Sequence, residues 1–501
     1  MSKSQIKIGA LLSYISLGVG FIVSISYTPF MLRMMGQSEY GLYALVLTIV
    51  SYLSLMDFGF GAALVRYTSL FRSSGKHNKL PSLYGMFIFL YSMVGIICLI
   101  IGYGLFLSTD AFFQNTLTET ELSKAKIMVL VITVYLSISF PLSIFGAIIT
   151  AYERFVFLKI MNIVRTLLVP IIMIPFLLFG YKSVTMAIVL VTVGFLVTLS
   201  NIYYCFKQIK IKVSFHYFDK VLLKEIMFFS VLVFLKILLE RLYWSSGQFI
   251  LGATIGTSAV AIFSIALQMK GYYESFSQAI GNLFLPRLTS INSTFFDINT
   301  TNELFIRVGR LQFHILSYIL CVYLIFGKQF INFWAGHNYE MAYYDSLIII
   351  IPYSIPLIQS LGNSLIQAIN IQKIQLPVYL ITVFITIIIS VILSPKYGAL
   401  GCSIAIGTAI IIGEVLLMNW IYWKRIGLDI LKFWKEIGKI FIPSLIIFII
   451  GFIAFQQFSN KNIFLLSLHI IFFTLVYFPA IYYFSMNFYE KNLIKSFIIK
   501  K

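Results

Sequence analysis

Long apolar segments separated by short polar ones run along the whole chain, and this pattern restricts the fold more than any motif does. A helix needs about 20 apolar residues to cross a membrane, and about fourteen segments reach that length. Lipid offers no hydrogen bonds to the backbone, so a spanning segment of this kind must be helical. The chain, 60% hydrophobic and 11% charged, is therefore predicted to be an all-α polytopic membrane protein. The predicted spans are 8–31, 41–65, 83–107, 127–150, 160–180, 184–205, 226–250, 259–285, 305–327, 344–368, 376–394, 399–422, 438–457 and 463–486.

The two halves of the chain are similar to each other. Gly36–Tyr43 matches Gly256–Phe263, and Leu64–Leu70 matches Leu285–Ile291 at nearly the same distance along the chain. Two like halves are the usual plan of a secondary transporter, with the substrate path between them. We therefore predict two pseudo-symmetric six-helix lobes followed by a C-terminal helix pair. The predicted parts are an N-terminal lobe 1–205, a cytoplasmic linker 206–225, a C-terminal lobe 226–423, and a helix pair with a basic tail 424–501.

The net charge of +19 is distributed unevenly along the chain. With the N-terminus inside, most Lys and Arg residues fall in the inner segments and few in the outer loops. Cytoplasmic loops of membrane proteins carry such an excess, so the asymmetry predicts that both termini are cytoplasmic. It also accounts for the basic charge without nucleic acid, which is not an expected partner. The outer cations are Arg33, Lys124, Lys126, Lys182, Lys328, Lys396 and Lys461.

Motifs of catalysis and metal binding are missing from the sequence. The four cysteines lie in or beside apolar spans without metal-ligand spacing, and no P-loop for ATP occurs. His314, within a predicted span, is interpreted as a packed or interfacial residue rather than a proton carrier. We therefore expect no enzyme activity, no catalytic residue, no metal and no cofactor.

Charged residues inside the predicted spans are the strongest local signal, because a charge in a membrane is costly and usually faces a cavity. Lys236 and Glu240 are four residues apart, as are Lys270 and Glu274, so each pair can meet on one helix face. The pairs are either structural, joining neighbouring helices, or they line a hydrated cavity whose cations hold an anion. The residues are Asp57, Arg165, Lys236, Glu240, Arg241, Lys270, Glu274 and Glu414.

Arg66 and Arg287 occupy equivalent positions in the two repeats, at the inner ends of their spans. Two guanidinium groups that converge there would form a bidentate clamp for a phosphate or pyrophosphate. Arg307 and Arg310, at the start of the following span, could widen the same basic mouth. The alternative is that Arg66 and Arg287 are ordinary inside-positive anchors.

The N-terminal run Gly36–Tyr43, followed by Asp57–Gly61 and Arg66, resembles the opening of Wzx-type polysaccharide flippases. The segment Phe333–Gly336 with Tyr339 is similar to an outer loop of that family. These flippases belong to the multidrug/oligosaccharidyl-lipid/polysaccharide exporter superfamily. The resemblance extends over the whole chain in span number and symmetry. It implies two six-helix lobes, with spans 1, 2, 7 and 8 lining a cavity.

The resemblance also implies a function. The expected substrate is an undecaprenyl-pyrophosphate-linked oligosaccharide, an O-antigen or lipopolysaccharide precursor, moved from the inner to the outer leaflet of the bacterial inner membrane by alternating access. Proton or sodium gradients or the membrane potential would supply the energy. Membrane lipids and other polysaccharide assembly proteins are candidate partners. The implied substrate-binding residues are Arg66, Arg287, Lys236, Arg241 and Lys270. The implied ion-coupling residues are Asp57, Glu240 and Glu274.

Three other functions remain open at this point. A lipid II flippase of the same superfamily would share the architecture and also require cations. A multidrug or cation antiporter should favour carboxylates, whereas spans 7 and 8 hold more cations than carboxylates. A membrane polysaccharide polymerase or glycosyltransferase would need a large outer loop with catalytic carboxylates, and the outer stretches 108–126 and 328–343 are short.

Overall fold

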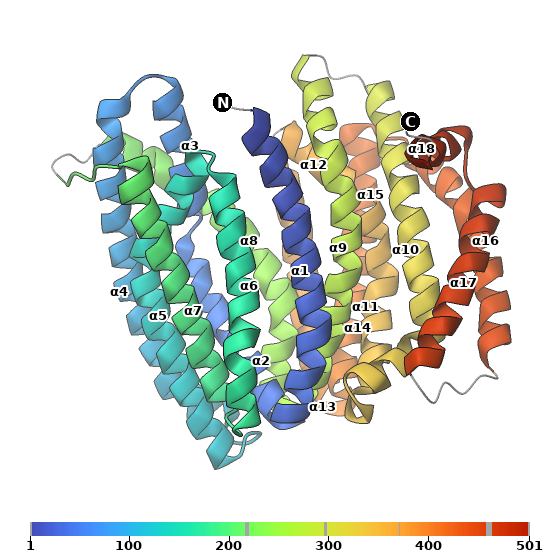
Figure 1. Cartoon of the computed structure of the whole chain (residues 1–501), viewed down its shortest axis with the longest axis horizontal. Helices are drawn as coiled ribbons and strands as arrows, with labels where there is room; N and C mark the ends of the chain where they lie inside the picture. Colours follow the sequence, from blue (N-terminus) through green and yellow to red (C-terminus); the bar gives the residue numbers. More distant parts are fainter. Residues whose placement is uncertain (1–2, 216–219, 295–297, 370, 457–462, 499–501) are drawn as a thin grey trace. The chain divides into compact units, whose positions relative to one another are not determined.

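The computed structural model is helical throughout the residues that it describes (Figure 1). Twelve helical segments in this part of the chain are long and apolar enough to cross a membrane, and they coincide with twelve of the predicted spans. The other two predicted spans lie in helices of 35 and 38 residues. The predicted all-α polytopic fold class is therefore confirmed. The described residues are 3–215, 220–294, 298–369, 371–456 and 463–498.

The chain divides into two compact units, with the boundary after Ala261. The helices of the first unit are α1 (Lys3–Met35), α2 (Gln37–Leu53), α3 (Phe60–Ser73), α4 (Leu80–Phe113), α5 (Glu119–Ala151), α6 (Phe155–Leu178), α7 (Ser183–Tyr204) and α8 (Lys220–Thr254). Helix α9 (Thr257–Thr294) starts at the end of this unit. Those of the second unit are α10 (Ile298–Trp334), α11 (Met341–Ile358), α12 (Ser360–Ala368), α13 (Leu376–Tyr397), α14 (Ala399–Ala409), α15 (Met418–Ile421), α16 (Ile430–Gln456), α17 (Ile463–Phe484) and α18 (Phe488–Ile498).

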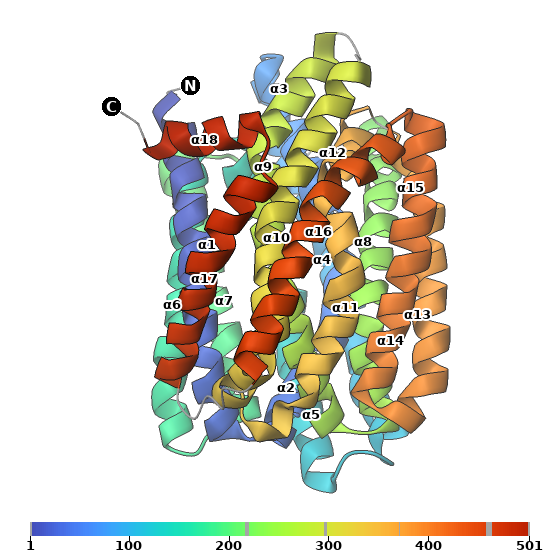
Figure 2. The same ribbon diagram turned by 90° about the vertical axis from the view of Figure 1, so that its right-hand side faces the viewer.

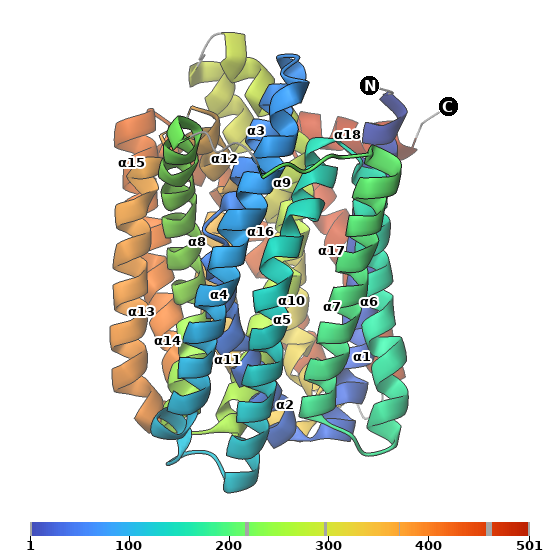
Figure 3. The ribbon, with the colours of Figure 1, turned by 90° about the vertical axis from the view of Figure 1, so that its left-hand side faces the viewer.

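In the first unit α4 packs along α5, which also packs against α7, while α1 packs against α6 (Figure 3). Glycines make the closest of these contacts possible. A side chain at Gly95 of α4 would start only 2.4 Å from the carbonyl oxygen of Ser137 on α5. A side chain at Gly85 would meet the carbonyl oxygen of Ser214, whose N–H donates to the carbonyl of Pro81 at 2.9 Å. Small residues therefore bring the neighbouring backbones together, as is typical of membrane helices.

The predicted span 41–65 is not one continuous helix. Helix α2 ends at Leu53, a short 3₁₀ turn (η1, Ser54–Asp57) follows, and α3 starts at Phe60. Phe58 and Gly59 join the two with left-handed backbone angles, φ 48° and 74°. Gly59 is suited to this conformation, and a side chain there would also collide with Val233 of α8.

In the second unit α10 packs against α11, α16 and α17, while α13 packs along α14 (Figure 2). Aromatic side chains fill the space beneath the last two spans: Phe326 of α10 lies edge-on to Phe455 of α16 and Phe473 of α17. Many large apolar side chains remain exposed on the outer faces of the spans, among them Phe384 at 62% and Ile450 at 62%. Exposure of this kind is expected where lipid, rather than water, surrounds the helices.

Helix α18 lies across the end of α17 (Figure 2) and is held there by a buried ion cluster. Arg310 of α10, only 3% exposed, donates from Nε to Oε1 of Glu490 at 2.7 Å and from Nη2 to Oε2 at 2.9 Å. Its Nη1 donates to Glu436 of α16 at 3.1 Å, and His314 Nε2 lies 3.2 Å from Glu490. Arg310 is thus a structural centre that joins three helices. The prediction that it widens a basic mouth is wrong, because its guanidinium is enclosed.

The Glu490 carboxyl is strongly acidic in this cluster. Burial on its own would raise its pKa, but hydrogen bonds from His314, Arg310 and the backbone of Asn487 outweigh burial and lower the pKa from 4.5 to about 2. Since the folded-state pKa lies below the unfolded one, the cluster stabilises the fold fully above about pH 5 and loses this effect as the pH falls toward 2.

We predict that Glu490→Gln lowers the stability of the folded protein by about 3 kcal/mol, because it leaves the buried Arg310 charge without its main partner. The thermal midpoint of the purified protein should fall by several degrees at pH 7. Glu340→Gln is the matched control, since Glu340 pairs with Lys328 at an exposed site where an ion pair contributes at most about 1 kcal/mol. Equal losses in the two variants would contradict the role assigned to Glu490.

Candidate functional site

The predicted site residues lie on the helices on either side of the unit boundary. Asp57 and Arg66 belong to the broken second span, Lys236, Glu240 and Arg241 to α8, and Lys270, Glu274 and Arg287 to α9. The side chain of Arg287 lies outside the described residues, so its proposed pairing with Arg66 stays a prediction.

Asp57 lies at the break between α2 and α3. Its carboxylate accepts a hydrogen bond from the Tyr91 hydroxyl of α4 at 2.5 Å, and others from the backbone N–H groups of Gly59 and Gly61. The negative charge therefore lies at the positive end of the α3 dipole. The break is closed by α8, where Phe234 packs on Phe58 with ring centroids 4.9 Å apart. Asp57 thus fixes the start of the half-helix that carries Arg66.

Arg66 is exposed on α3 and lines a polar cavity of about 580 Å³ in the first unit. Arg72 and His77 line the same cavity, together with Glu153, Ser69 and Ser73. Arg72 is held in place because its Nη1 donates to the carbonyl of Ala151 at 2.7 Å and its guanidinium stacks 4.0 Å above the Tyr152 ring. Two guanidinium groups, an imidazole and two hydroxyls offer donors suited to an anionic oxygen ligand.

The charged residues of α8 do not form the ion pair that their spacing allows. Among the described residues, Lys236 and Glu240 are not joined by an ion pair, although they are four residues apart. Lys236 is half-buried, and both Glu240 and Arg241 are exposed. Arg241 lies within electrostatic range of Tyr52 on α2. These charges remain accessible on the α8 surface of the first unit.

Lys270 and Glu274 of α9 do form the expected ion pair, with Nζ 2.8 Å from Oε2. Lys270 is 8% exposed and also lies 4.5 Å from the ring centre of Tyr353 on α11. The Tyr353 hydroxyl donates to Oε1 of Glu274 at 3.1 Å, and Gln278 donates to the same oxygen at 2.9 Å. The cation and the carboxylate are therefore both held by α11 as well as by each other.

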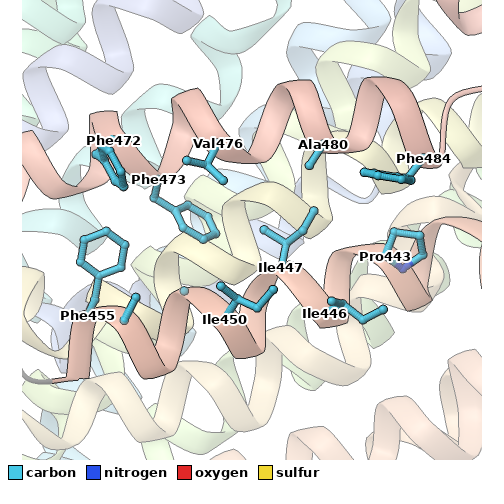
Figure 4. Close-up of a pocket in the computed structure, with 12 residues that line it drawn as sticks. Pro443, Ile446, Ile447, Ile450, Phe455, Phe472, Phe473, Val476, Ala480 and Phe484 are labelled. Carbon is cyan, nitrogen blue, oxygen red and sulfur yellow. The ribbon is translucent and has the colours of Figure 1, made fainter.

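Two further features of the second unit were not singled out from the sequence. Asp345 of α11 is completely buried, although it lies near the start of the predicted span 344–368 and could have been added to the intramembrane charges. The other feature is an apolar groove of about 440 Å³ between α16 and α17 (Figure 4). Its walls include Ile450, Phe473 and Ala480, and hydrocarbon is the chemistry that it accommodates. No residue pattern distinguishes this groove from an ordinary helix contact.

The broken span, the buried charges and the apolar outer faces define a multi-pass membrane protein of the transporter type. The chain matches the polysaccharide biosynthesis protein family over residues 7–291, and it belongs to that family. It is also 23% identical over 419 residues to a Shigella flexneri protein named "Putative O-antigen transporter", covering 80% of this chain and 94% of that one.

Solved structures share the fold. The lipid II flippase MurJ, in an inward closed conformation, superposes with a TM-score of 0.75 at 17% identity, covering 97% of this chain and 99% of MurJ. An inward-facing multidrug transporter of the MATE family superposes with a TM-score of 0.55 at 15% identity, covering 80% of this chain and 96% of the transporter. A transporter of the same MOP superfamily from Pyrococcus furiosus superposes with a TM-score of 0.57 at 12% identity, covering 83% of this chain and 96% of that one. At these identities the similarity establishes the fold, and the resemblance to the exporter superfamily is confirmed.

We predict that Asp57→Ala destabilises the protein more than Asp57→Asn. The alanine leaves the Tyr91 hydroxyl and two backbone N–H groups without an acceptor, at about 1–3 kcal/mol each when they are buried. An asparagine oxygen still accepts some of these hydrogen bonds. Thermal unfolding of the purified variants, with Tyr91→Phe for comparison, measures the difference. Equal midpoints for the alanine and asparagine variants would show that the carboxylate does not organise the break.

Proposed function

We propose that the protein is a flippase that moves an undecaprenyl-pyrophosphate-linked oligosaccharide from the inner to the outer leaflet of a bacterial inner membrane. Membership of the polysaccharide biosynthesis family carries this proposal. The O-antigen transporter name given to the Shigella flexneri relative and the fold shared with the flippase MurJ support it. The chain's own relatives are transporters, so we propose no chemical conversion of the substrate.

The chemistry of the substrate explains why cations are needed. A pyrophosphate and a sugar chain cannot enter hydrocarbon without a polar shelter, whereas the lipid tail is already soluble in the bilayer. In our proposal Arg66, with Arg72 beside it, receives the pyrophosphate in the polar cavity of the first unit. Lys270 provides a second cation on α9, and Lys236, Arg241 and Arg287 are further candidates. The two termini are proposed to lie in the cytoplasm.

The proposed transport cycle also requires a source of energy. Alternating access would move one lobe against the other, driven by a proton or sodium gradient or by the membrane potential. Asp57, Glu240 and Glu274 remain candidate ion-coupling residues. Asp57 and Glu274 are each engaged by several donors, so either would have to exchange hydrogen bonds during the cycle. Glu240 is exposed.

A lipid II flippase is the second candidate function, favoured by the superposition on MurJ over almost the whole chain. The two substrates share the polyprenyl pyrophosphate and differ in the sugar. The same cations would bind either substrate, so genetic complementation is needed to distinguish the two candidate substrates. A multidrug antiporter is less well supported, because the MATE structures superpose less closely.

We predict that a host lacking its O-antigen flippase regains surface polysaccharide when it carries the wild-type gene, and that Arg66→Ala and Lys270→Ala reduce the recovery about tenfold. The loss of one charged hydrogen bond to phosphate costs roughly 1.5–3 kcal/mol, which corresponds to at least a tenfold change in binding. Surface polysaccharide is measured by gel and antibody staining, with protein levels in the membrane checked by immunoblot.

Lys76→Ala is the matched control, because Lys76 is an exposed cation close to Arg66 in sequence but does not line the polar cavity. Full recovery of surface polysaccharide with the Arg66 and Lys270 variants would refute the assignment of these two residues to substrate binding. Rescue of a host depleted of its lipid II flippase, with no rescue of several O-antigen pathways, would instead select lipid II as the substrate.

A further inference from the structure

A second cavity of the first unit has a lining that the proposed function does not use. It lies where α3, α4 and α8 contact one another, and its volume is about 360 Å³. The lining combines apolar with polar side chains, unlike the polar cavity around Arg66. We call it the α3–α4 recess, and its lining residues are Phe71, Asn78, Lys79, Ser82, Leu83, Met86 and Leu222.

The floor of the α3–α4 recess is apolar. Phe71 of α3 and Leu83 and Met86 of α4 are at most 9% exposed, so they border the recess from the interior of the unit. Leu222 of α8, half-buried, adds a further apolar wall. A floor of this kind suits hydrocarbon, whereas a small inorganic ion would lose its water there without gaining partners. A ligand that fills the recess must therefore have an apolar part.

The rim of the recess is polar. Asn78 and Lys79, both exposed, belong to the 3₁₀ turn η2 (His77–Lys79) that joins α3 to α4. Hydrogen bonds hold this turn, because the Lys79 N–H donates to the carbonyl of Lys76 at 3.1 Å. Ser82, half-buried, lies in the first turn of α4. An ammonium group, an amide and a hydroxyl thus offer donors for an anionic oxygen at the mouth of the recess.

The charges at the recess favour a ligand with a single negative charge. Lys79 lines the recess, and the exposed Lys76 and Lys224 lie near it in sequence. Glu225, the next residue of α8, accepts a hydrogen bond from the Tyr67 hydroxyl at 3.4 Å. One lysine matches a phosphodiester, whereas the two guanidinium groups of the polar cavity match the larger charge of a pyrophosphate. The two cavities of the first unit therefore differ in the anion that they suit.

The recess continues into an apolar row along α4. Ser82 and Met86 are followed on the same helix face, at spacings of three or four residues, by side chains that are 49% to 66% exposed. Helix α4 is one of the candidate membrane spans, and exposed apolar side chains on a span face lipid. The recess therefore opens toward the bilayer side of α4. The exposed residues of the row are Phe89, Met93, Ile96 and Ile100.

We propose that the α3–α4 recess binds an anionic phospholipid of the leaflet that surrounds this end of the first unit. The phosphodiester accepts hydrogen bonds from Lys79, Asn78 and Ser82 at the rim. One acyl chain covers the apolar floor and follows the exposed row of α4 into the bilayer. A zwitterionic lipid fits less well, because its own cation competes with Lys79 for the phosphate. The inference concerns this lipid alone and does not depend on which substrate is transported.

A lipid in the recess would also bear on the neighbouring polar cavity. The connection between α3 and α4 separates the two cavities: Phe71 lines the recess and Arg72 lines the polar cavity. In the following turn His77 lines the polar cavity, whereas Asn78 and Lys79 line the recess. A ligand that bridges the turn and α4 therefore restrains the segment that carries Arg72 and His77.

The test measures thermal unfolding of the purified full-length protein in detergent with increasing dioleoyl phosphatidylglycerol. Parallel titrations use dioleoyl phosphatidylcholine, inorganic phosphate and undecaprenyl phosphate. A ligand that binds the folded protein raises the midpoint, and the concentration needed for a given rise reports its affinity. The variants are Lys79→Ala, which removes the rim cation, and Ser82→Phe, which fills the recess without changing its charge. Lys76→Ala is the matched control, because Lys76 is exposed and does not line the recess.

The site is supported if phosphatidylglycerol raises the wild-type midpoint by several degrees more than phosphatidylcholine does. Lys79→Ala should then need about tenfold more phosphatidylglycerol for the same rise, as expected when a charged hydrogen bond is lost. Ser82→Phe should remove the difference between the two lipids. Lys76→Ala should need at most about fivefold more, the effect of one lysine near an anionic surface.

Equal rises with the two phospholipids, or a full rise with inorganic phosphate, would overturn the proposal. Equal losses in Lys79→Ala and Lys76→Ala would reduce it to general attraction to an anionic surface. A rise with undecaprenyl phosphate that Lys79→Ala removes, without one for phosphatidylglycerol, would instead assign the recess to the substrate. If Ser82→Phe does not fold, the comparison of Lys79→Ala with Lys76→Ala decides. Failure of the flippase proposal would appear only in the polysaccharide assay, so the two outcomes are distinguishable.

Discussion

The energy required to bury a charge among apolar helices governs the interior of both units. Specific hydrogen-bond donors offset this energy for three of the buried or half-buried carboxylates. Asp57 accepts from Tyr91 and two backbone N–H groups, and Glu274 accepts from Lys270 and Tyr353. Glu490 accepts from Arg310. Each arrangement joins helices that are distant in sequence, so satisfying the charge also fixes the packing. The ionic groups thus contribute to a defined arrangement of spans whose other contacts are largely apolar.

Helix breaks follow from the same constraint. The turn between α2 and α3 leaves backbone N–H groups without helical partners, and the Asp57 carboxylate accepts from two residues there. The left-handed angles of Phe58 and Gly59 let α3 restart after the turn. Broken helices at binding sites are frequent in transporters because they expose polar backbone and a helix dipole inside the membrane. Here the restarted helix carries Arg66 to the polar cavity.

The sequence was sufficient to predict the helical membrane fold, because apolar length and backbone hydrogen bonding leave few alternatives. It also predicted the Lys270–Glu274 pair, since an i,i+4 spacing on one helix is a local property. It could not predict that Lys236 and Glu240 remain apart, or that Glu490, near the C-terminus, reaches Arg310. Those outcomes depend on which helices pack together. Asp345 was overlooked because a carboxylate near a predicted span boundary resembles an interfacial residue, whereas α11 begins earlier, at Met341.

The Lys270–Glu274 pair poses a particular requirement for any anionic substrate. Lys270 already has a carboxylate at 2.8 Å and an aromatic ring at 4.5 Å, so a phosphate gains little unless it replaces Glu274 as the partner. Replacement would leave Glu274 with Tyr353 and Gln278 as donors, and its charge would then favour the uptake of a proton or another cation. Binding of an anion at Lys270 and of a cation at Glu274 would therefore assist each other. By thermodynamic linkage each ligand would raise the affinity for the other by the same factor. A pair that is structural at rest can in this way serve as a coupling element, and the two interpretations of it are not exclusive.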